Sequence, residues 1–314
     1  MQKKVRSPLS KNAPPNGKTA EPMKLLRTLL FAPCTRPELM AKAQDSLADG
    51  LIFDLEDSVP LQAKVQARRT VTQAFAQGLK KPTFLRINHP RAGDAQADLD
   101  TLGQVAVSRL QGIILPKAEA PADLEWLSNR LDVIEARMGM VRGTFKILPL
   151  VETCLGLRNT YDLARASERV CGMSLASAEQ GDFMVDLGGH WSPASLALAY
   201  PRSKMVVDAR AAGLSWLVDG VFMNLSDPAA LQTECRLARE LGFIGKMAIH
   251  PSQIEVMHQI FSPSAQEVEQ ARGLLEAYRA AEAQGIGAVR FQGMMVDYAN
   301  VRLAERTLSL VQDR

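Results

Sequence analysis

The amino-acid sequence predicts an α/β protein and, within that class, a (β/α)8 TIM barrel with a C-terminal helical lid extension. Two observations lead to this prediction. Short apolar, β-rich runs alternate with longer amphipathic stretches, which is the pattern of parallel α/β architecture. Eight such runs can be counted, the number that closes a barrel of this kind. They lie near residues 29–31, 51–53, 84–87, 112–115, 147–150, 169–173, 216–218 and 247–249.

The stretches between these runs predict helices. They are rich in Ala, Leu, Gln and Arg, which favour helix, and they are bounded by Gly and Pro, as in residues 62–77, 122–138 and 229–241. After the eighth run the chain continues with a predicted helix over 265–284, a strand-like 288–292 and a last helix from Asn300. Barrel closure does not need this addition, so we expect a barrel over 25–262 and a lid over 263–314.

Composition limits the class of protein. The 314 residues are 46% hydrophobic, enough for one large core. No apolar run approaches the roughly 18 residues that span a membrane, and no apolar segment follows the basic N-terminus, so neither membrane insertion nor secretion is expected. The four cysteines form no Cys-x-x-Cys pair, which fits a reducing cytoplasm better than a zinc or redox motif.

The formal net charge of +3 arises in the N-terminal segment. Residues 1–24 hold six of the 37 basic residues and one of the 34 acidic residues, among many Pro, Asn and Lys. We expect this segment to be a disordered basic tail, and the remainder of the chain is slightly acidic. Nucleic-acid binding is therefore not expected.

Polar residues follow the predicted strands at the ends where each strand stops. Asp54, Glu56 and Asp57 follow the second run, and the later runs are followed in the same way by Arg86 and Asn88, Lys117, Glu152 and His250. In a barrel the carboxyl ends of the strands converge on one mouth, where active sites of this fold are built. This convergence predicts an enzyme.

The acidic residues of this set suit a hard cation. Glu152 ends an apolar run, and Asp182 lies beyond the sixth run, with Asp186 on the same helical face. Mg²⁺ takes oxygen ligands, usually one or two carboxylates together with substrate and water. Glu152 could alternatively cap a helix or pair with Arg158, and Arg86 could either grip a substrate carboxylate or form a structural bridge to Asp54 or Glu56.

The chain resembles the citrate lyase β-subunit-like enzymes of the HpcH/HpaI aldolase superfamily. The segments that carry the resemblance are 27–33, 54–59 (Asp-Leu-Glu-Asp-Ser-Val), 85–88, 115–117, 151–153 with Gly156, 182–188 and 245–253, in this order, and a C-terminal motif over 293–297. The resemblance implies a Mg²⁺-dependent carbon–carbon lyase acting on a CoA thioester and assembled as a homo-oligomer, a trimer or a hexamer.

The resemblance also implies roles for individual residues. Glu152 and Asp182 match the metal carboxylates, Glu152 thereby also binding substrate, and Arg86 matches the substrate-binding arginine. Asp297 matches a catalytic Asp brought to a neighbouring subunit's site. The expected reaction is cleavage of citramalyl-CoA or malyl-CoA to acetyl-CoA and a 2-oxo acid such as pyruvate or glyoxylate. Supporting positions around the site are assigned to Asp54, Glu56, Asp57 and Lys117.

Several expectations stay open on the sequence. Arg27, Arg36 and Lys42 are candidate contacts for CoA phosphates, although exposed basic side chains are often only solvated. Lys117 or Lys246 could instead form a Schiff base. The chain could also be a malyl-CoA thioesterase, a citrate-lyase β-like subunit for a citryl thioester, or a non-catalytic scaffold. Gly181 and Cys34 depart from the family pattern, which usually has an acidic residue and a Gly there.

Overall fold

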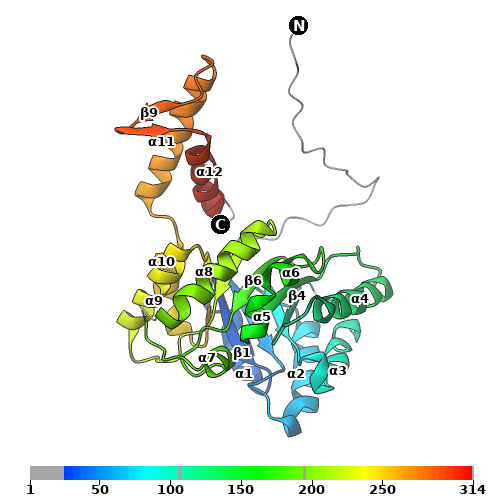
Figure 1. Cartoon of the computed structure of the whole chain (residues 1–314). Coiled ribbons are helices and arrows are strands. Elements are labelled where there is room, and N and C mark those ends of the chain that lie inside the picture. The colour runs from blue at the N-terminus through cyan, green and yellow to red at the C-terminus, as the bar shows by residue number, and fades with distance from the viewer. Residues whose placement is uncertain (1–24, 105–107, 194–195, 313–314) are drawn as a thin grey trace.

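The computed structural model describes residues 25–104, 108–193 and 196–312, so the predicted tail over 1–24 lies outside the described residues. Eight parallel strands form a closed barrel in sequence order, and β1 pairs with β8 through Leu29 and Met247 (Figure 1). The predicted barrel is confirmed. Its strands are β1 Thr28–Pro33, β2 Gly50–Asp54, β3 Thr83–Arg86, β4 Leu110–Leu115, β5 Lys146–Val151, β6 Gly172–Leu175, β7 Trp216–Asp219 and β8 Gly245–Ala248.

Helices surround the barrel because each connection carries an apolar face that packs on the strands. Leu124, Leu127 and Leu131 of one such helix repeat at helical spacing and are buried. The helices around the barrel are α1 Pro37–Gln44, α2 Lys64–Gln77, α3 Ala95–Leu99, α4 Pro121–Arg137, α5 Cys154–Arg158, α6 Thr160–Arg165, α7 Asp182–Leu187, α8 Leu196–Ala211, α9 Pro228–Leu241 and α10 Ile254–Phe261. Short 3-10 turns occupy Leu61–Ala63, Pro90–Ala92, Leu102–Gln104 and Pro251–Gln253.

The sixth strand begins later than the sequence predicts. Its regular pairing starts at Gly172, and before it only Val170 forms a bridge, to Ile147. The side chain of Arg169 forms ion pairs with Asp132 and with Glu135, the latter at 2.6 Å, while its carbonyl accepts from the backbone N–H of Ile147. These carboxylates satisfy a buried guanidinium just before the strand.

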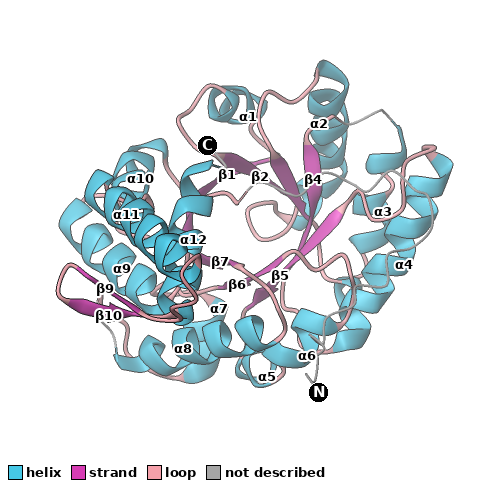
Figure 2. Cartoon of the chain, turned by 90° about the horizontal axis from the view of Figure 1, so that it is seen from above, coloured by secondary structure: helices cyan, strands magenta, loops and turns pink. Residues whose placement is uncertain are grey.

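The C-terminal extension consists of α11 Ala265–Glu282, β9 Val289–Phe291, β10 Met294–Val296 and α12 Tyr298–Gln312. It has a small apolar core of its own, including Leu275, Tyr278 and Val296. It lies on the face of the barrel where the strands begin, because Arg306 donates to the carbonyl of Gly242, just before β8, and Leu310 packs against the apolar cluster that includes Leu26 and Ile244. Figures 1 and 2 show it standing over that face.

Within the described residues, none of the helices is both long enough and apolar enough to cross a membrane.

Candidate active site

The site lies at the carboxyl ends of β2 to β6, where the sequence places its polar residues. Strand β2 is buried along its whole length and ends at Asp54, which is 1% exposed. Its carboxylate accepts hydrogen bonds from the backbone N–H groups of Glu56 at 2.9 Å and Ser58 at 3.2 Å. The loop therefore turns around Asp54, and this turn directs the Glu56 side chain towards the neighbouring strand ends.

Arg86, the last residue of β3, forms a two-point bridge to Asp54. Its Nε and Nη2 donate to the two carboxylate oxygens at 2.7 and 2.8 Å, and its Nη1 lies 2.9 Å from Glu56. The guanidinium also lies 4.9 Å from the ring centre of Phe31. Although burial opposes ionisation of Asp54, the Arg86 charge holds its pKa below the usual value. The bridge that the sequence left open is present.

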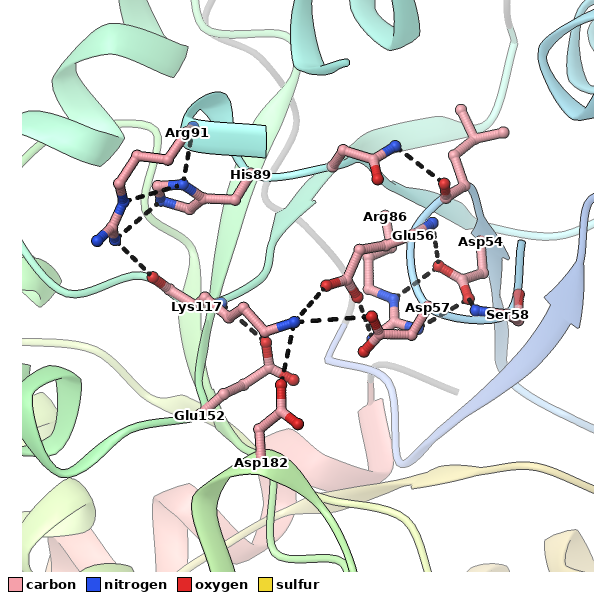
Figure 3. Close-up of polar contacts among 12 residues, drawn as sticks. Asp54, Glu56, Asp57, Ser58, Arg86, His89, Arg91, Lys117, Glu152 and Asp182 are labelled. Carbon is pink, nitrogen blue, oxygen red and sulfur yellow. Dashed lines mark hydrogen bonds and ion pairs between the residues drawn. The ribbon is translucent and has the colours of Figure 1, made fainter. Parts of the chain in front are cut away.

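Lys117 is the hub of the polar contacts (Figure 3). It follows β4 with a positive φ of 50°. Its Nζ lies 2.9 Å from Glu56, 3.0 Å from Asp182 and 3.6 Å from Asp57, and its backbone N–H donates to Glu152 at 2.8 Å. Burial would lower the pKa of Lys117, but these carboxylates raise it well above the usual value. A protonated amine is no nucleophile, which argues against Lys117 as a Schiff-base residue.

Glu152 is a buried carboxylate at the mouth with a strongly shifted pKa. It follows β5, is 5% exposed, and has a pKa raised to about 8 by burial and by the neighbouring charge of Glu56. Asp182 opens α7 and is half-exposed. Asp186 does not join it, because its carboxylate accepts from the backbone N–H of Cys154 at 2.6 Å.

We refer to the residues around Lys117 as the mouth cluster: Asp54, Glu56, Asp57, Arg86, Lys117, Glu152 and Asp182. Its carboxylates outnumber its cations, and an excess of buried negative charge is costly without a counter-ion.

Oxygen donors with surplus negative charge fit Mg²⁺, and Glu152 and Asp182 are the residues that could hold it. Among residues 25–104, 108–193 and 196–312, no group of three or more His, Cys, Asp or Glu side chains is arranged around one metal position. This is compatible with Mg²⁺, which commonly binds through only one or two protein carboxylates and completes its shell with substrate and water.

Gly181 lies directly before Asp182, at the N-cap of α7. A Cβ at this position would lie 3.2 Å from the Cβ of Ala178, which is a tight contact. The turn into α7 is therefore packed around the missing side chain, which gives a physical reason for glycine here.

The candidate CoA contacts separate into two places. Arg27 precedes β1, on the face opposite the mouth, and is held by Asp49 at 2.6 Å and by Ser262 at 2.8 Å. This position argues against a role for Arg27 in binding CoA at the mouth. Arg36 is exposed at the N-cap of α1, on the mouth side, where it pairs with Glu38, and Lys42 is exposed further along α1.

Asp297 does not reach the mouth of its own barrel. It is exposed in the C-terminal extension, where its carboxylate accepts from the backbone N–H of Ala299 at 2.9 Å and so caps α12. Because the extension stands over the opposite face, the described chain contains no contact between Asp297 and the mouth cluster.

Sequence reasoning missed a buried lysine that supports the site. Lys64 of α2 is 8% exposed, and its Nζ donates at 2.7 Å to the carbonyls of Leu55 and Glu56 and to Asn88. It thereby fixes the loop that carries Glu56. No periodic signal distinguishes Lys64 from the solvated lysines on other helices, although its partner Asn88 stands at a strand end.

A second buried ionic cluster was also missed in part. Lys246 of β8 is fully buried, with its Nζ 2.7 Å from Asp219 and 3.2 Å from Glu234. Arg202 contacts the same two carboxylates at 2.9 and 2.6 Å. We refer to these four residues as the sealed cluster. A lysine closed off from solvent and ion-paired twice is unsuited to Schiff-base chemistry, which argues against Lys246 as well.

Comparisons with known proteins show the family to which the chain belongs. The family model described as HpcH/HpaI aldolase/citrate lyase matches residues 27–251, and one described as a C–C bond lyase of the TIM-barrel fold matches 203–311. The chain is 33% identical to the citrate lyase subunit beta of Haemophilus influenzae, covering 88% of this chain and 93% of that protein. It is 31% identical to the human mitochondrial citramalyl-CoA lyase, covering 90% and 85%.

A solved structure has a similar fold. The protein CitE from Mycobacterium tuberculosis, in complex with magnesium, acetoacetate and coenzyme A, superposes with a TM-score of 0.72 at 31% sequence identity. The match covers 92% of this chain and 98% of that one.

Proposed function

The chain belongs to the HpcH/HpaI aldolase/citrate lyase family, and on this premise we propose that it is a Mg²⁺-dependent carbon–carbon lyase acting on a CoA thioester. The substrate class we infer is a 3-hydroxy-3-carboxyacyl-CoA of the citramalyl-CoA or malyl-CoA type. The products are acetyl-CoA and a 2-oxo acid such as pyruvate or glyoxylate.

The observation that carries the proposal is the surplus of carboxylates in the mouth cluster. Glu152 is buried with a raised pKa, and a nearby divalent cation would stabilise its charged form. The human citramalyl-CoA lyase supports this substrate class, and CitE, in complex with magnesium and coenzyme A, supports the metal and the thioester.

The chemistry assigns a task to each residue. Glu152 and Asp182 would hold the metal, which would supply a Lewis acid for the substrate's hydroxyl oxygen. Arg86, kept in place by Asp54, would bind the substrate carboxylate through Nη1, in exchange for the contact of Nη1 with Glu56. The hydroxyl proton would pass to water, the hydroxyl carbon would become the 2-oxo group, and the electron pair of the broken carbon–carbon bond would leave on the thioester enolate. Asp297 of a neighbouring copy would then deliver a proton to this enolate and regain one from water.

A homo-oligomer is part of this proposal. Asp297 stands on the far face of its own barrel, beside the exposed side chains of Met294, Met295 and Tyr298, which are 64%, 74% and 64% exposed. Apolar side chains grouped in this way suit a protein interface. We infer a trimer, or a hexamer of two trimers, in which each extension serves a neighbouring mouth.

The first experiment measures acetyl-CoA release from purified citramalyl-CoA and malyl-CoA, each with Mg²⁺ and with EDTA. Cleavage is expected only with Mg²⁺, and chromatography separates acetyl-CoA from the free CoA that a thioesterase would release. If neither substrate yields acetyl-CoA, the lyase proposal fails, and Gly181 beside Asp182 becomes the first position to examine.

The shared site has a sharper test in mixed oligomers. Glu152→Gln and Asp297→Asn are each expected to be inactive, but refolding them together produces some interfaces that combine an intact Glu152 with an intact Asp297. Activity should reappear in the mixture and stay absent when either variant is refolded alone. Mixtures that remain inactive despite exchanging subunits would contradict a site shared between copies.

The second candidate is a β-like subunit of a citrate-lyase complex, and the likeness to the Haemophilus influenzae protein favours it. It predicts cleavage of a citryl thioester and a stoichiometric partner carrying the acyl group. A purified protein that cleaves free CoA thioesters at full rate without a partner would speak against it, as it would against a non-catalytic scaffold.

A further inference from the structure

The geometry points to Lys117 as a positioning residue of the proposed metal site. Its backbone N–H orients Glu152. Its side-chain ammonium is the counter-ion of Asp182 when no metal is bound, and it competes with the metal for that carboxylate. This inference rests on the proposed function, because it assigns Lys117 a role towards the proposed Mg²⁺.

The backbone of Lys117 is held in an unusual conformation. Its φ of 50° lies in the left-handed region that residues other than glycine rarely adopt. The N–H donates to Glu152 at 2.8 Å, and the carbonyl accepts from Arg91 at 3.4 Å. Gly156 closes the turn from the other side, since a Cβ there would lie 2.5 Å from the carbonyl oxygen of Ala118. The turn therefore aims a backbone donor at Glu152.

The side chain of Lys117 connects carboxylates that come from different loops. Its Nζ contacts Glu56 at 2.9 Å and Asp182 at 3.0 Å, with Asp57 at 3.6 Å. Glu56 is also paired with Arg86, so it has a second cation. Asp182 is half-exposed, and its carboxylate forms an ion pair with Lys117. The ammonium of Lys117 thus neutralises Asp182, the proposed metal ligand, whereas Glu56 is also neutralised by Arg86.

Two consequences follow for cation binding. A metal that takes Asp182 competes with the ammonium for that carboxylate, and the two positive charges repel each other at this range. Lys117 therefore weakens Mg²⁺ binding while keeping the metal-free mouth cluster together. After displacement the ammonium retains Glu56 and Asp57, so its removal from Asp182 does not leave it without a partner.

The test is Mg²⁺ binding by isothermal titration calorimetry at pH 8.5, without substrate. Lys117→Met should bind Mg²⁺ about tenfold more tightly or better, because a repelling unit charge has been removed. Lys117→Arg keeps the charge and should bind as the unmodified protein does. Lys80→Met, which removes an exposed lysine far from the mouth, is the matched control and should not change the affinity.

Lys117→Gly is a second test in case Lys117→Met does not fold, because glycine adopts the left-handed backbone conformation without strain and keeps the N–H that donates to Glu152. It should tighten Mg²⁺ binding as Lys117→Met does, and in both variants Mg²⁺ should raise the melting temperature more than in the unmodified protein. Unchanged or weaker affinity in Lys117→Gly would overturn the inference and leave the proposed function standing. Failure of the unmodified protein to bind Mg²⁺ would overturn both.

Discussion

The mouth cluster and the sealed cluster are both buried ionic groups on the same barrel, but they differ in balance. In the sealed cluster, Arg202 and Lys246 face Asp219 and Glu234 between the barrel wall and helices α8 and α9, and all four side chains are 0% exposed. In the mouth cluster the carboxylates outnumber the cations, and Lys117 and Asp182 reach solvent. One group is neutral and closed, and the other is negative and open.

The difference appears in the pKa values of one carboxylate from each cluster. Asp219 is fully buried, yet its pKa is lowered to about 2 because Arg202 and Lys246 more than offset the cost of burial. Glu152 is almost as buried, but its pKa is raised to about 8 because burial and Glu56 prevail. A matched cluster stabilises its charges, whereas an unmatched one requires a cation from outside. The ratio of carboxylates to cations in a buried cluster therefore distinguishes structural ion pairs from a functional site.

The largest expected effect is on folding. Asp219→Ala leaves Arg202 and Lys246 buried with only Glu234 between them, which should cost about 3–5 kcal/mol of unfolding free energy. Such a loss is a large part of the stability of an ordinary domain. Urea denaturation followed by circular dichroism measures it. An unchanged midpoint would mean that the sealed cluster contributes no net stability and that the contrast with the mouth is mistaken.

The second expected effect is on catalysis. Glu152→Gln removes a proposed metal ligand and should lower lyase turnover by at least about a hundredfold. The same change removes an unmatched buried charge, so the unfolding free energy without metal should stay constant or rise. Steady-state kinetics and urea denaturation on one preparation test both points. A stability loss like that of Asp219→Ala would place Glu152 with the structural residues.

The sequence revealed the mouth cluster more readily than the sealed one, although both depend on the same signal. An acidic residue ends an apolar run at Asp54 and equally at Asp219. The Asp54 carboxylate contacts Arg86 at the mouth, whereas the Asp219 carboxylate contacts Arg202 on the outer helix α8. That direction depends on strand register and on helices far along the chain, so a local pattern cannot supply it.

Arg27 illustrates a related limit. Its motif marks the first strand correctly, but the strand has two ends, and Arg27 stands before Thr28 rather than after Pro33. The fold itself was predictable, because alternating runs and their number are local and countable. Partners such as Ser262 for Arg27 are brought together only by closure of the barrel, and no spacing in the sequence encodes them.

The third prediction concerns the pH dependence of stability, measured in EDTA so that no metal is bound. The two clusters should change the unfolding free energy in opposite directions as pH rises. The raised pKa of Glu152 means that the fold prefers its protonated form, so stability from this group is lost as pH rises from 4.5 to about 8. The lowered pKa of Asp219 means that its contribution is lost as pH falls from 3.8 to about 2. Denaturation from pH 2 to 9 should show both limbs, and Glu152→Gln should flatten only the limb between pH 4.5 and about 8.

The smallest expected effects compare two arginines at opposite ends of β1. Arg36→Met, at the exposed rim, should raise the KM for the CoA thioester by a few-fold, with kcat and stability unchanged, because an exposed ion pair is worth about 0–1 kcal/mol. Arg27→Met should leave KM unchanged but lower the unfolding free energy by about 1–3 kcal/mol, because Asp49 loses its two-point partner. The reverse outcome, a raised KM only in Arg27→Met, would place CoA on the face where the strands begin. It would contradict the proposal that the CoA thioester binds at the mouth cluster.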